Sequence, residues 1–242
     1  MNSWWPSLRI AAAALGTAAI VRQLTQSVGN ALDSSTEWGA HLPTVVANFF
    51  SFFTILSNIG AVVAFTAGAV WMLRTRRNDT PEPRWLAVLL VCASTYMIVT
   101  GIVYNVLLRG ISLEGLSEVW TNETLHVIIP LAMLADVLFA PRRRALGWSA
   151  ALIAAIFPIV WAVYTMVRAN FVTGPLTGNA WWYPYPFLDP HAPSSYLVVA
   201  VYIVGIAVVI VGVAAGVVAI GRRRGIRASD DDERSTEPAL AS

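Results

Sequence analysis

The sequence predicts an all-α membrane protein in which six helices cross the bilayer. Two observations predict this fold class. Of the 242 residues, 57% are hydrophobic and only 12% are charged, a composition that does not suit a soluble chain. The hydrophobic residues also gather into stretches of roughly 20, the length that a helix needs to cross a hydrocarbon core.

Six stretches qualify as spans, followed by a polar tail. The first is short and rich in alanine, so a cleaved signal peptide is an alternative, but no good cleavage site follows and we interpret it as a span. The second is too long for a perpendicular helix, so its first turns are expected to tilt or to project outside the bilayer. Residues 1–220 form one domain, and 221–242 is predicted to be a disordered cytoplasmic extension. The spans run approximately Leu8 to Leu24, Val45 to Leu73, Trp85 to Leu108, Glu123 to Ala140, Leu146 to Val167 and Tyr196 to Ile220.

The arginines set the predicted orientation. All 16 basic residues are arginine, and thirteen of them fall on one side of the six spans against three on the other, namely Arg22, Arg109 and Arg168. Because cytoplasmic loops carry the excess of positive charge, both termini are predicted to be cytoplasmic, in an inner or plasma membrane. The long aromatic loop from Ala169 to Ser195 is then external.

Composition also excludes several partners and cofactors. A formal charge of +2, with dispersed arginines, does not suit a nucleic-acid binder. The single Cys92 permits neither an intrachain disulfide nor a cysteine metal site. A metal would depend on three histidines without helical pairing, so we expect no metal and no cofactor. The expected partners are membrane lipids.

Polar residues inside the spans are the candidates for function, because such side chains are costly in hydrocarbon. With the predicted orientation, Thr54 of the second span, Tyr104 and Asn105 of the third and His126 of the fourth all lie in the outer part of the bilayer. Asn58 shares the helix face of Thr54. These residues are therefore predicted to meet in one outward-facing polar pocket.

Asp136 is predicted to lie outside this pocket. It follows His126 by ten residues, which on a helix places it about 15 Å deeper and rotates it by about 280°. It cannot orient His126, and pairing with an arginine of 142–144 is the simpler interpretation.

Each of these residues also has an ordinary structural interpretation. Threonine and asparagine on membrane helices commonly bond to neighbouring helices or to their own backbone. His126 could be a hydrated histidine near the interface. In the external loop, Tyr185 and Asp189 lie on a proline-rich segment that could be a lid on the pocket or a simple aromatic belt.

A threonine and a histidine at one depth are the minimum for covalent ester hydrolysis, because a base must take the threonine proton. We predict Thr54 as nucleophile and His126 as base, with Asn58, Tyr104 and Asn105 as candidate donors to the oxyanion. No G-x-S-x-G or H-E-x-x-H motif is present.

Four segments carry a resemblance to a known family. They are Phe53 to Asn58, Thr100 to Arg109, His126 with Pro130 and Asp136, and Tyr185 to Asp189. They resemble a group of six-span bacterial membrane proteins similar to the androgen-induced and androgen-dependent TFPI-regulating proteins of animals. The animal proteins are intramembrane threonine hydrolases of fatty-acid esters, and the resemblance implies the nucleophile at Thr54 and the histidine at His126.

The sequence thus favours an intramembrane threonine-dependent hydrolase of lipid esters. Two alternatives stay open: a membrane protein that binds or transports a small lipid or polar solute without chemistry, and a structural partner of another membrane complex.

Overall fold

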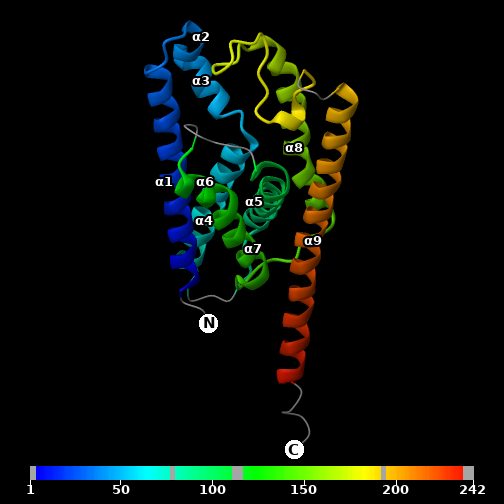
Figure 1. Ribbon diagram of the computed structural model, residues 1–242. Coiled ribbons are helices and arrows are strands. Elements are labelled where there is room, and N and C mark those ends of the chain that lie inside the picture. The colour runs from blue at the N-terminus through cyan, green and yellow to red at the C-terminus, as the bar shows by residue number, and fades with distance from the viewer. Residues whose placement is uncertain (1–3, 77–79, 111–116, 192–194, 237–242) are drawn as a thin grey trace, which may run out of the picture.

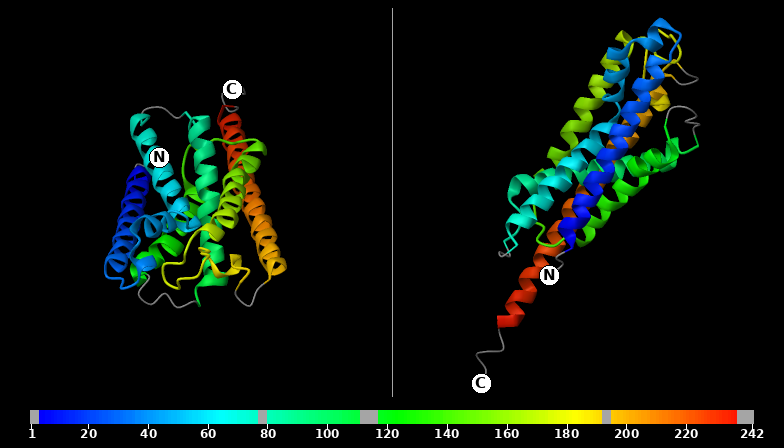
Figure 2. Two further views of the ribbon diagram at one scale, coloured as in Figure 1. Left: turned by 90° about the horizontal axis from the view of Figure 1, so that it is seen from above. Right: turned by 90° about the vertical axis from the view of Figure 1, so that its left-hand side faces the viewer.

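The computed structural model describes residues 4–76, 80–110, 117–191 and 195–236, without the side chains of 225–236. Throughout these ranges the regular structure is helical (Figure 1). Two helices, α1 and α9, lie on opposite sides of the bundle with α4, α5 and α7 between them (Figures 1 and 2). The longer helices are α1 (Trp5–Leu32), α3 (Leu42–Phe49), α4 (Phe53–Arg74), α5 (Arg84–Val103), α7 (Ile129–Phe139), α8 (Ser149–Arg168) and α9 (Tyr196–Thr236).

Five helical stretches of the described chain are long and apolar enough to cross a membrane, which suits an integral membrane protein. They are Phe53–Arg74, Arg84–Leu108, Val119–Phe139, Ser149–Phe171 and Tyr196–Arg224. The predicted first span, within α1, is not among them, so five of the six predicted spans are supported. Even so, α1 packs along α4 through small residues, and Gly16 allows Val62 and Ile129 to approach its backbone.

The second predicted span, whose first turns were expected to tilt or to project outside the bilayer, is not one continuous helix. The chain ends α3 at Phe49 and begins α4 at Phe53, with Phe52 extended at φ −69° and ψ 128°. Backbone at such a break must find other partners. Trp161 of α8 donates to the carbonyl of Ser51 at 2.9 Å, and Tyr164 contacts the Ser51 hydroxyl at 3.0 Å. The break gives α4 a new N-terminus inside the bundle.

The third and fourth spans each contain a π-helical turn. These are η1 (Tyr104–Leu108), which follows α5, and η2 (Thr124–Ile128), which joins α6 (Val119–Glu123) to α7. In η2 the cause is Pro130, which has no N–H to offer to the carbonyl of His126. Gly101 accommodates this segment, because a Cβ there would lie 3.0 Å from Pro130. Such turns often mark functional sites in helices.

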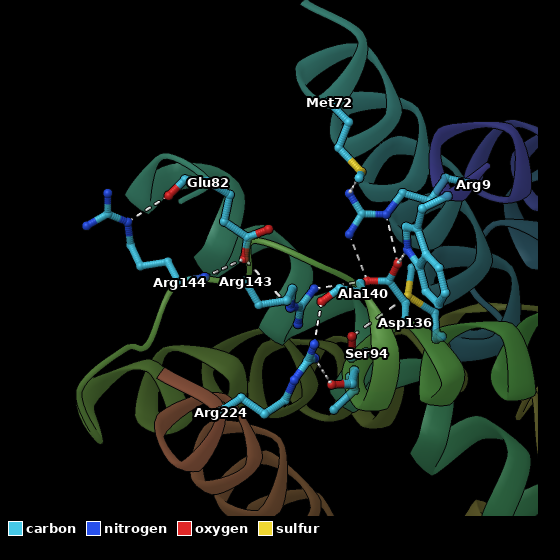
Figure 3. Close-up of polar contacts among 12 residues, drawn as sticks. Arg9, Met72, Glu82, Ser94, Asp136, Ala140, Arg143, Arg144 and Arg224 are labelled. Carbon is cyan, nitrogen blue, oxygen red and sulfur yellow. Dashed lines mark hydrogen bonds and ion pairs between the residues drawn. The ribbon is translucent and has the colours of Figure 1, made fainter. Parts of the chain in front are cut away.

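The last helix is longer than the sequence predicts. It continues beyond the predicted end of the sixth span at Ile220 to Thr236, over most of the segment predicted as a disordered tail, and it projects from the bundle (Figure 2). Residues 237–242 of that predicted tail lie outside the described ranges. α1 begins and α9 ends at the same end of the bundle (Figure 1), where Arg143 and Arg144 lie near Arg9 of α1 (Figure 3).

A buried charge cluster holds this arginine-rich end together (Figure 3). Arg9 of α1 donates to both carboxylate oxygens of Asp136 on α7, from Nε at 2.7 Å and from Nη2 at 2.9 Å. Arg143 reaches Asp136 at 3.0 Å and Glu82 at 3.6 Å. The predicted pairing of Asp136 with an arginine of 142–144 is confirmed, but its principal partner is Arg9. Outside the spans, burial raises the pKa of the Glu82 carboxyl.

Candidate functional site

Thr54 and His126 meet inside the bundle, as their predicted depth requires. Thr54 is the second residue of α4 and lies just after the break, with 8% of its surface exposed. His126 lies in the π turn η2. The Thr54 Oγ1 atom is 3.3 Å from Nε2 of His126, within hydrogen-bond distance. A hydroxyl and a neutral imidazole nitrogen in this contact can transfer a proton.

Two neighbours fix the histidine ring. The Nδ1 atom of His126 lies 2.9 Å from the carbonyl oxygen of Asn122, one turn earlier on its own helix. Because a carbonyl only accepts, Nδ1 must carry the proton, which leaves Nε2 free to accept from Thr54. Tyr104 stacks on the imidazole at 4.2 Å, and its hydroxyl accepts from the Asn122 side chain. The ring is therefore held in the tautomer that a general base requires.

Tyr185 also contacts the threonine directly. Its hydroxyl is 3.2 Å from both the backbone N and Oγ1 of Thr54. All three groups are satisfied when the Thr54 N–H donates to the phenol oxygen, the phenol donates to Oγ1, and Oγ1 donates to His126. Burial raises the pKa of the Tyr185 phenol, so it keeps its proton and remains a donor.

The first turn of α4 adds a favourable field. Phe52, the N-cap residue, supplies no side-chain cap, and no acidic residue lies in this first turn. The N–H groups at a helix start carry a partial positive charge. Negative charge that develops near Thr54 during a reaction is therefore stabilised by the end of α4, an end created by the break in the predicted second span.

The other predicted site residues are not all near Thr54. Asn58 is buried, but its amide hydrogens go to the carbonyls of Thr54 at 2.8 Å and Leu125 at 3.1 Å, so it ties α4 to η2 and has no hydrogen left for an oxyanion. Asn105 is exposed and bonds to Gly101 and Arg109, away from the site. Asn105 thus lines neither cavity at Thr54, and Asn58 holds α4 against η2 beside the site.

Asp189 and Tyr185 lie on the loop between α8 and α9, and both line the cavity beside Thr54. The loop runs from α8 through the short helix η4 (Pro186–Leu188) and places Tyr185 in the site. Asp189 lies further out, where Oδ1 accepts from the backbone N of His191 at 2.8 Å. Tyr185 is anchored by Phe52 and Trp161 as well as by Thr54. The loop is packed on the site, and its residues from Trp182 to Pro186 line the cavity beside it.

Two cavities meet at Thr54 and His126. The apolar cavity has a volume of about 270 Å³ and is lined mostly by hydrophobic side chains of α5, α8 and α9. The polar cavity, about 570 Å³, lies among α1, α3 and the loop and contains amides and hydroxyls, among them Gln23, Ser27 and Asn48. Five residues line both: Thr54, Tyr104, Leu108, His126 and Tyr185. The reactive pair therefore lies at a boundary between apolar and polar space.

Sequence reasoning missed the roles of Asn122 and Tyr185. The contact of His126 with the Asn122 carbonyl could have been predicted from the sequence, because Asn122 lies four residues earlier on the same helix. No local pattern predicts that Tyr185 reaches Thr54 across 131 residues. Among the described residues no group of three metal-binding side chains gathers. No family model, curated protein or solved structure matches the chain.

Proposed function

We propose that the protein is an intramembrane hydrolase of lipid esters that uses Thr54 as nucleophile and His126 as general base. The observation that carries this proposal is the 3.3 Å contact between Thr54 Oγ1 and His126 Nε2 at the meeting point of an apolar and a polar cavity. Four features needed for ester hydrolysis lie around Thr54 Oγ1: the nucleophile itself, a base held in the correct tautomer, a phenol donor and the start of a helix. The sequence resemblance assigns the same two residues.

The chemistry proceeds in two halves. His126 takes the Thr54 proton as Oγ1 bonds to the ester carbonyl carbon, and the negative oxygen is stabilised by Tyr185 and the start of α4. The ester C–O bond then breaks, and His126 returns the proton to the leaving alcohol. Water from the polar cavity attacks the acyl-threonine with His126 again as base, which releases a fatty acid and restores Thr54. The sum is ester plus water to acid plus alcohol.

The apolar cavity gives a route for the substrate. Three of its lining residues, Ile159 and Val163 on α8 and Val211 on α9, are exposed on the outer face of the bundle. At the arginine-rich end α8 and α9 pack closely through Ala154 and Ala214. An acyl chain can therefore enter sideways from lipid between the two helices, while its ester group reaches Thr54.

Labelling and turnover test the proposal together. Protein in nanodiscs should react with a fluorophosphonate probe and hydrolyse 4-nitrophenyl octanoate. Thr54→Ala and His126→Ala should each abolish turnover, and Thr54→Ser should keep part of it because the hydroxyl survives. The double variant should be no worse than either single one, since the two act as a unit.

Thr95→Ala is the matched control. Thr95 is a buried membrane threonine whose hydroxyl bonds to the carbonyl of Val91, and it lines neither cavity, so its loss should leave turnover unchanged. Absence of labelling and turnover in the wild-type protein, with lipid still bound, would overturn the hydrolase proposal and favour a non-enzymatic lipid-binding protein.

A further inference from the structure

The polar cavity indicates what the leaving alcohol is. When an acyl chain fills the apolar cavity and its carbonyl lies at Thr54, the alcohol portion of the ester must extend into the polar cavity, because the two cavities meet at this point. The chemistry of this second wall therefore selects the head group. This inference rests on the proposed function and makes it more specific.

The polar cavity offers hydrogen bonds of both kinds. Asn48 is buried, and its Oδ1 accepts from Arg168 at 2.8 Å, which leaves Nδ2 as a donor without a partner among the described residues. Across the cavity, Oε1 of Gln23 on α1 is a buried acceptor without a described partner. Buried polar atoms normally have partners. A hydroxyl group can satisfy both, because it donates and accepts.

The charges around the cavity disfavour an anionic head group. None of the described lining residues is arginine, and besides His126 and three tyrosines the one ionisable residue among them is Asp189, a carboxylate. The arginines beside the cavity already have partners: Arg22 pairs with Glu118, Arg109 pairs with Glu123 at 3.1 Å, and Arg168 donates to Asn48 at 2.8 Å. A carboxylate or phosphate would lose its hydration, meet Asp189 and have to draw Arg168 away from Asn48 to find a cation.

A cationic head group fits no better. The Asp189 carboxylate already accepts from the backbone of His191 and contacts its ring nitrogen at 3.1 Å. The ring of Trp182, the indole in this wall, already has the Arg168 guanidinium at 5.7 Å. The indole face in this wall, the strongest cation-binding ring type, is therefore already occupied by the protein's own cation.

We infer that the substrate is a fatty acyl ester of a neutral polyol, such as a monoacylglycerol, whose free hydroxyls bond to Asn48 and Gln23 in the polar cavity. The acyl chain lies in the apolar cavity and the ester at Thr54. After cleavage the polyol leaves through the polar cavity and the fatty acid returns to the lipid.

Three substrates with the same oleoyl chain separate head-group recognition from hydrolysis. They are methyl oleate, which has no free hydroxyl, 1-oleoylglycerol, and 1-oleoylglycerol 3-phosphate, in which a charged phosphate replaces one free hydroxyl. In nanodiscs of neutral lipid, 1-oleoylglycerol should have the highest kcat/KM, about a hundredfold above methyl oleate, which is about tenfold for each of two well-made hydrogen bonds. The phosphate ester should be turned over more slowly than 1-oleoylglycerol.

Two variants test the assigned contacts. Asn48→Asp keeps the acceptor for Arg168 but removes the Nδ2 donor, and Gln23→Met keeps the length of the side chain but removes its acceptor. Each should reduce the preference for 1-oleoylglycerol over methyl oleate by about tenfold. Gln26→Met, one turn along α1 and outside both cavities, is the matched control and should leave that ratio unchanged.

The outcomes distinguish the two proposals. Equal kcat/KM for methyl oleate and 1-oleoylglycerol, or the fastest turnover for the phosphate ester, would overturn the polyol assignment and leave the hydrolase standing. A preference that survives both Asn48→Asp and Gln23→Met would also overturn it. Failure to hydrolyse any of the three esters would overturn the hydrolase and this inference with it.

Discussion

Removing the two partners of the buried Arg9–Asp136 pair one at a time should destabilise the protein unequally. In Arg9→Met, Asp136 loses two bonds but keeps Trp5 Nε1 at 2.9 Å and Arg143 Nη1 at 3.0 Å. In Asp136→Leu, the guanidinium of Arg9, at 1% exposure, keeps only the contact to Met72 Sδ at 3.5 Å among those described. Breaking a buried ion pair lowers the free energy of unfolding by about 3–5 kcal/mol. We therefore expect a loss of about 3 kcal/mol for Arg9→Met and about 5 kcal/mol for Asp136→Leu.

The double variant should be less damaging than Asp136→Leu alone, because removing both charges leaves no unpaired buried ion. Unfolding in mixed micelles with increasing SDS, followed by the fluorescence of the ten tryptophans, gives the free energies. Equal costs for the two single variants, or a double variant whose cost is their sum, would refute the reasoning.

Gly68→Ala offers an independent check on the same pair. A Cβ at Gly68 would lie 2.4 Å from Nη1 of Arg9, and this guanidinium cannot simply move because Asp136 holds it. The substitution should therefore destabilise the wild-type protein, and it should cost less in the Arg9→Met background, where the side chain can bend away.

Three further predictions concern the site and the membrane orientation. Tyr185→Phe should lower turnover about tenfold to a hundredfold with unchanged amounts of inserted protein, because it removes a donor to Thr54 but keeps the ring; a drop in inserted protein instead would indicate a purely structural anchor. Ala162→Trp should obstruct the apolar cavity and slow oleoyl esters more than acetyl esters, whereas Val160→Trp on the exposed face of α8 should not; equal effects would exclude this cavity as the acyl site. A reporter at the C-terminus should behave as cytoplasmic and one inserted at Gly178 as external, and the reverse result would contradict the arginine-based orientation.

The sequence by itself determined most of the apolar helices and the common level of Thr54 and His126 along them. Hydropathy is a local property, so five of the six predicted spans correspond to apolar helices, and counting residues along them is enough to place Thr54 and His126 at one level. Spacing along one helix was enough to separate Asp136 from His126.

Only the tertiary structure decided which polar groups face one another. The break before Phe53, the approach of Tyr185 to Thr54 across 131 residues and the pairing of Arg9 with Asp136 across 127 residues depend on neighbours from distant segments. Hydropathy does not record the rotation of a helix about its axis, and this is why Asn105 was expected in the pocket but lies outside it. The composition of a span fixes that it lies in the membrane, whereas packing against the other helices fixes the direction in which each polar side chain points.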